Sequence, residues 1–147
     1  MAYNVIDIAN KIIASTDTSQ GDLISNLKLQ KLLYYCQGFF LAATGERLFD
    51  NSIEAWQYGP VVSEVYHNFK HFGNGEISIS ADTQLIELKP TEEALFNEVL
   101  DEYAQFSAIK LMNMTHDESP WKNTFPEKPQ AVIPDEVIIE YFKNQIA

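Results

Sequence analysis

The stretch KLQKLLYYCQGFFLAATGERLFDNSIEAWQYGPVV, residues 28–62, decides how this chain folds. Its first part has the spacing of an α-helix, which we expect over about 26–43, with Ser25 as N-cap and Gly45 as C-cap. Apolar side chains surround most of this helix instead of forming one stripe, which predicts a central helix packed on several sides. The residues expected to be buried are Leu29, Leu32, Leu33, Cys36, Phe39 and Phe40.

The rest of the chain predicts further helices around this one. Apolar residues recur at helical spacing near 3–14, 61–73, 91–105, 107–115 and 134–146. In the helix after Ser107, we expect Ile109 and Met112 to face inward. Pro60 is expected in the first turn of the helix that follows it.

Between the predicted helices, two short segments alternate in polarity. EISIS and QLIEL predict a small β-hairpin over about 76–88. Residues 15–22 predict a loop, and residues 116–134, which hold four of the six prolines, predict an irregular strap. The fold class is therefore mainly α: one domain over 1–147, a bundle of five to seven helices with a small hairpin.

Composition narrows the function classes. The single cysteine, Cys36, excludes an intrachain disulfide, and no apolar stretch is long enough for a membrane span, so we expect a cytoplasmic protein without membrane contact. Ten basic residues against 21 acidic ones give a net charge of −11, and Arg47 is the only arginine. Direct nucleic-acid binding is not expected, because it needs a basic patch. This charge would attract a basic protein partner, although it equally suits a surface selected for solubility.

One candidate metal site lies in the helix after Pro60. Glu64, His67 and His71 are spaced i, i+3 and i+7, so they would share one face of a continuous helix. The residue after His67 is Asn68, so the consecutive glutamate of the zinc-protease motif is missing. Surface histidines without a metal are the alternative interpretation, and no cofactor is predicted.

A second candidate is THDESPW, residues 115–121. His116 with Asp117 and Glu118 suggests an acid–base pair. The structural alternative is that His116 ends a helix and that Pro120 and Trp121 fasten the strap to the core.

A third set suggests a surface for a macromolecular partner. Lys28, Lys31 and Tyr35 are predicted to lie along one edge of the central helix. Trp56 and Tyr58 flank the turn before Pro60, and aromatic side chains concentrate binding energy at interfaces. The predicted partner-binding residues are Lys28, Lys31, Tyr35, Trp56, Tyr58, His116 and Trp121, with no catalytic residue among them.

Three motifs in this order resemble one known family. They are LKLQKLLYYCQGFFLAATGERLFD, IEAWQYGPVVSEVY and MTHDESPW, and IPDEVIIEYF resembles the family's closing helix. Together they resemble the SocA-like, or Panacea, antitoxin domain, which also occurs in GepA-type phage-associated proteins. The resemblance extends over essentially the whole chain.

The resemblance implies a protein-binding module that neutralises a cognate toxin encoded nearby. It also implies an adaptor that presents the toxin to a ClpXP-type protease. The alternatives are a phage or mobile-element regulator that acts on a host protein, and a metal-dependent enzyme that uses Glu64, His67 and His71.

Overall fold

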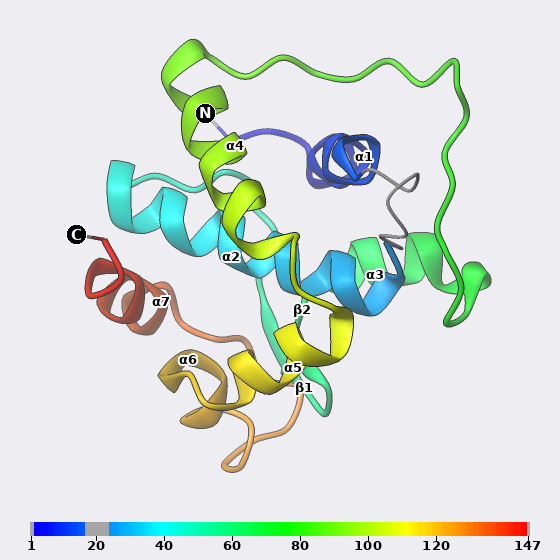
Figure 1. Cartoon of the computed structure of the whole chain (residues 1–147). Coiled ribbons are helices and arrows are strands. Elements are labelled where there is room, and N and C mark those ends of the chain that lie inside the picture. Colours follow the sequence, from blue (N-terminus) through cyan, green and yellow to red (C-terminus); the bar gives the residue numbers. More distant parts are fainter. Residues whose placement is uncertain (1, 17–23, 147) are drawn as a thin grey trace.

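The computed structural model describes residues 2–16 and 24–146 (Figure 1). The α-helices are α1 (Val5–Ser15), α2 (Asn26–Thr44), α3 (Ser63–Phe69), α4 (Pro90–Tyr103), α5 (Ala108–His116), α6 (Ser119–Lys122) and α7 (Asp135–Lys143). A short 3₁₀ helix, η2 (Lys70–Phe72), follows α3, and strands β1 (Glu54–Trp56) and β2 (Gly59–Val61) form an antiparallel hairpin. The predicted mainly helical fold is confirmed. Most of the loop predicted at 15–22 lies outside the described residues.

The central helix is α2, and its predicted ends are confirmed. The Ser25 side chain accepts a hydrogen bond from the backbone amide of Lys28, and Gly45 ends the helix in the left-handed conformation, with φ 77°. Other helices and strand β2 pack around α2, so it is buried on several sides (Figure 1). The core residues predicted on α2 are buried except Phe39, which is partly exposed at the edge of the cluster. Burial also raises the pKa of the Cys36 thiol, which makes a nucleophilic role for it unfavourable.

The hairpin prediction was wrong in its position. Residues 76–88 form no ladder but run as an extended strap from η2 to α4, which passes around α1 (Figure 1). The amide of Ile77 donates to the carbonyl of Ile24 at 2.8 Å, and Lys11 Nζ donates to the carbonyl of Ile86 at 3.0 Å. The strap buries Ile77 and Leu88 against the core. Its alternation therefore reflects burial of one side of an extended chain, a pattern that strand pairing shares.

The actual hairpin lies in the stretch quoted above. Trp56 pairs with Gly59 across a two-residue turn, and Gly59 has φ 114°, which favours glycine. Pro60 therefore lies in β2 and not in a first helical turn, and α3 begins only at Ser63. Beyond β1, the amide of Ala55 donates to the carbonyl of Ala131 at 2.9 Å, so the segment after α6 closes the outer edge of the hairpin. The irregular strap predicted at 116–134 contains α6, so that prediction was wrong for residues 119–122.

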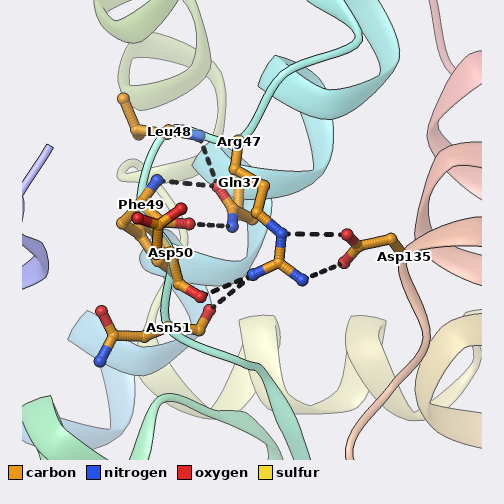
Figure 2. Close-up of polar contacts among 7 residues, drawn as sticks. All are labelled: Gln37, Arg47, Leu48, Phe49, Asp50, Asn51 and Asp135. Atoms are coloured by element: carbon orange, nitrogen blue, oxygen red, sulfur yellow. Dashed lines mark hydrogen bonds and ion pairs between the residues drawn. The ribbon is translucent and has the colours of Figure 1, made fainter. Parts of the chain in front are cut away.

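The link between α2 and β1 is held by two side chains (Figure 2). Gln37 donates to the carbonyl of Phe49 at 2.7 Å and accepts from the amide of Leu48 at 2.8 Å. Arg47 forms a two-point pair with Asp135, with Nε to Oδ2 at 3.0 Å and Nη2 to Oδ1 at 2.8 Å. The only arginine of the chain thus ties this link to the start of α7.

Candidate partner-binding site

Lys31 lies at the junction of α2 and the hairpin. Its side chain is 0% exposed, and its Nζ donates to the carbonyl of Pro60 at 3.2 Å. Its stem fits against Gly59, where a β-carbon would lie only 2.5 Å from Lys31 Cε. Burial lowers the pKa of Lys31 to about 7, because the interior disfavours the charged ammonium.

The predicted exposure of the two lysines on α2 was wrong. Lys28 is 3% exposed, and its Nζ donates to the carbonyl of Ala104 at 2.7 Å. Because α2 is enclosed on several sides, the edge that was expected to face solvent packs against α4, α5 and the hairpin. At the predicted surface, alanine in place of either lysine would be neutral for folding, but at these buried positions it should destabilise the protein.

Tyr35 is also buried, and it belongs to a cluster around Glu118. The Tyr34 hydroxyl donates to Glu118 Oε1 at 2.8 Å and the Tyr35 hydroxyl donates to Oε2 at 2.7 Å. Burial raises the pKa of the Glu118 carboxyl, while the tyrosine hydrogen bonds act in the opposite direction. Tyr103 stacks on Tyr35 with ring centroids 4.0 Å apart. Tyr35 therefore joins α2, α4 and the residue that precedes α6, and it offers no surface to a partner.

His116, at the end of α5, and Trp121, on α6, fasten residues 116–121 to the hairpin. Their rings stack with centroids 4.0 Å apart, and Trp121 Nε1 donates to the carbonyl of Trp56 at 2.7 Å. His116 bonds with the backbone of Gln57, whereas its buried Nε2 atom has no hydrogen-bond partner among the described residues. Burial, and secondly the charge of Lys31, lower the pKa of His116. Glu118 instead bonds to the tyrosines, so it does not pair with His116, and the charge of Asp117 only partly offsets the lowering of the His116 pKa. The fastening role agrees with these contacts.

A groove of about 870 Å³ opens beside this junction, between the start of α2, the hairpin and α5. Tyr58 and Ile109 stand on its walls and are 58% and 57% exposed. The inward orientation predicted for Ile109 was therefore wrong. Trp56, Tyr66 and Met112 are partly buried in the same walls. Exposed aromatic and aliphatic side chains around a concave surface are suited to binding a protein segment.

The predicted metal ligands do not form a metal site. Helix α3 ends at Phe69 and His71 lies in η2, so the three residues do not share a continuous α-helix. Glu64 Oε1 accepts from Asn51 Nδ2 at 2.8 Å. Among residues 2–16 and 24–146, no group of three or more His, Cys, Asp or Glu side chains is arranged to hold a metal ion.

The helices of the described part of the chain also include none that is both long and apolar enough to cross a membrane. The enclosed central helix, the short hairpin and the adjoining groove define a mainly α-helical fold with a concave surface beside the hairpin.

Comparison with known proteins identifies the family. The model described as "Antitoxin SocA-like, Panacea domain" matches residues 29–122, and the chain belongs to this family. Antitoxin SocA of Caulobacter vibrioides (strain NA1000 / CB15N) is 35% identical over 109 residues, which are 67% of this chain and 58% of that protein. The chain thus matches less than two thirds of the length of this curated relative. No solved structure matches the chain.

The three motifs behind the resemblance meet in space. Lys31 comes from the first motif, Gly59 and Pro60 from the second, and His116 and Trp121 from the third, and they contact one another directly or through one residue. The sequence singled out most of these residues but placed Lys31 on the surface. Ile109 was missed as a surface residue because its position in a helical repeat resembles that of a core residue.

Proposed function

We propose that this protein is an antitoxin that binds a toxin encoded by a neighbouring gene and thereby neutralises it. The observation that carries the proposal is membership of the SocA-like antitoxin family, with residues 29–122 matching the family model. The convergence of the three motifs beside an exposed groove supports binding of a protein as the mode of action. In this proposal the protein has no catalytic role.

The proposed contact surface is the groove and its surroundings. Of the residues predicted to bind a partner, Tyr58 is exposed and Trp56 is partly buried in the groove wall, while His116 and Trp121 are partly buried behind Trp56 and do not line the groove. Lys28, Lys31 and Tyr35 would contribute indirectly, by holding α2 and the hairpin in place. Fixed walls favour binding, because less conformational entropy is lost when the partner docks.

The net charge of −11 supports a basic toxin as the partner. Glu98, Asp101 and Glu102 are exposed on α4, so part of this charge faces solvent on one helix. Such a field would raise the association rate with a basic protein, and this effect would weaken as salt screens the charges.

The first test is neutralisation in cells. We would express the product of each adjacent open reading frame alone and together with this protein, and then purify any complex. The proposal expects a neighbour that stops growth alone, loses this effect on co-expression, and co-purifies with the antitoxin. A set of neighbours that are harmless alone and never co-purify contradicts it.

We further propose that the complex presents the toxin to a ClpXP-type protease. The strains that express the toxin alone and together with the antitoxin can test this, each with and without ClpX. Toxin decay would be followed after translation is stopped. The proposal expects the toxin to decay faster only when both the antitoxin and ClpX are present. Equal toxin lifetimes in all strains, combined with full neutralisation, would leave neutralisation by binding and reject the adaptor role.

A further inference from the structure

We infer that the groove beside the hairpin binds a toxin segment that presents an apolar side chain together with a carboxylate. This inference rests on the proposed antitoxin function and specifies the chemistry of the partner at one site. The acidic surface of this protein would attract the basic residues of the toxin. The groove would instead bind a different part of the toxin, the segment with the apolar side chain and the carboxylate.

The apolar half of the inference comes from exposure. Tyr58 and Ile109 are the two most exposed large hydrophobic side chains of the described residues, and both line this groove. Leu27 and Met112 continue the lining from α2 and α5, and both are partly buried. A partner's apolar side chain inserted between these walls would cover surface that is otherwise in contact with water.

The carboxylate half comes from the distribution of charge. The chain contains 21 acidic residues, but none lines the groove within the described part of the chain, where Lys70 is exposed in the lining and Lys31 is buried with a lowered pKa. Lys110 and Lys128 are exposed and lie close in sequence to the lining residues Ile109 and Gln130. Glu54 lies two residues before the lining residue Trp56 and accepts a hydrogen bond from its indole at 2.9 Å. Within the described residues, the groove therefore has no acidic lining residue and offers the exposed Lys70, which favours a carboxylate there.

The polar floor of the groove has little capacity left for other ligands. The Asn26 side chain donates to the carbonyl of Tyr66 at 3.0 Å and accepts from Gln30 Nε2 at 2.9 Å. The Gln30 oxygen accepts from the amide of Val62 at 2.8 Å. Because these two amides already bond to each other and to the backbone, they are not available to hydrogen-bond a ligand. An apolar group with one charge at the rim fits better.

The apolar half can be tested on the purified complex with the toxin that neutralisation identifies. We would measure the dissociation constant for Tyr58→Ala and Ile109→Ala, with Leu85→Ala as the matched control. Leu85 is 44% exposed, lies in the extended segment at 76–88, and does not line the groove. We expect each groove variant to weaken binding at least tenfold and the control to change it less than threefold. Binding unchanged in both groove variants, with neutralisation by the wild type intact, overturns the inference and leaves the proposed function standing.

The carboxylate half needs a pair of variants with equal net charge. Lys70→Glu and Lys143→Glu each lower the net charge by two, and both lysines are exposed, but only Lys70 lines the groove. We expect Lys70→Glu to weaken binding about tenfold more than Lys143→Glu. Substitution of the contacting toxin Asp or Glu by Lys should restore binding of the toxin to the Lys70→Glu variant. Equal effects of the two lysine variants would reject the carboxylate.

Two other occupants of the groove have distinct signatures. If a second copy of this chain fills it, Tyr58→Ala and Ile109→Ala would convert a dimer into a monomer, as seen by light scattering, while toxin binding persists. If a small molecule fills it, the same variants would lose that molecule, as seen by native mass spectrometry, without weaker toxin binding. Either result overturns the inference.

Discussion

Lys31 and Gly59 are in direct contact inside the protein, with the lysine stem filling the space that a side chain at position 59 would need. This contact joins the central helix to the hairpin, and it lies beside Thr115 on α5. It therefore fixes the hairpin that carries Tyr58 relative to the rest of the groove.

Gly59→Ala should destabilise the protein strongly. The new β-carbon would lie 2.5 Å from Lys31 Cε and 2.9 Å from Thr115 Oγ1, and Gly59 has φ +114°. Overpacking of roughly 1–3 kcal/mol and backbone strain of roughly 1–2 kcal/mol together predict a loss of about 2–5 kcal/mol in the free energy of unfolding. Gly45→Ala is the control, because Gly45 has φ +77° with open space around it. Urea unfolding should show only the strain for Gly45→Ala, and equal losses would contradict the packing argument.

Lys31→Met should change how stability depends on pH. The pKa of Lys31 is lowered to about 7 in the folded protein, against about 10.4 in an unfolded chain. Between these values the unfolded chain binds more protons at this side chain, so its contribution makes stability rise with pH. From pH 7 to pH 9, wild-type stability should rise by about 2 kcal/mol relative to Lys31→Met. Parallel pH profiles of the two proteins would show that Lys31 keeps its charge when buried.

Leu33→Ala should leave a cavity in the core. Leu33 is fully buried on α2, and such truncations cost about 2–5 kcal/mol. The exposed Leu85 offers a matched control, since Leu85→Ala removes the same atoms from the surface strap and should cost less than about 1 kcal/mol. Thermal or urea unfolding would reveal a misassigned core if the two variants lost similar stability.

Glu118→Gln should alter stability on the acid side. Burial raises the pKa of Glu118, so over the range above its ordinary value the folded protein holds a proton that the unfolded chain has released. The contribution of Glu118 to stability is thus present at low pH and is lost as the pH rises through the raised pKa. The wild type should lose stability relative to Glu118→Gln over this range in urea titrations.

The opposite slope in that comparison would mean that the tyrosine hydrogen bonds outweigh burial. Tyr35→Phe separates the two causes, because it removes one hydroxyl that donates to the carboxylate at 2.7 Å. This variant should move the acid-side change to higher pH, since the hydrogen bond lowers the pKa of Glu118.

The sequence predicted the helical framework well, because caps and apolar spacing are local signals. Ser25 and Gly45 bound α2 as expected, and Ser107 caps α5. The hairpin was misplaced because alternation in the strap and alternation in a paired strand have the same period. Pairing depends on a partner segment, which a local pattern does not specify.

For the candidate site, the sequence singled out residues that do lie together, but it did not predict which of them are buried, because burial also depends on segments distant in sequence. Trp56, Tyr58, His116 and Trp121 do gather around one region. Lys31 was assigned to the surface because lysine is almost never fully buried without a partner. Its burial depends on Gly59 and Pro60, which are distant in sequence and come together only through the fold.

The Arg47–Asp135 pair has a consequence for where this fold can be cut (Figure 2). Helix α7 lies beyond residue 122, where the family match ends, yet Arg47 holds its first residue and Phe142 fills the hollow above Gly38. The segment that the family model matches therefore packs against a helix that lies outside the matched residues. A chain shortened to residues 29–122 would expose the Tyr34 and Tyr35 rings that now lie against Phe142. Such a chain would be prone to aggregate.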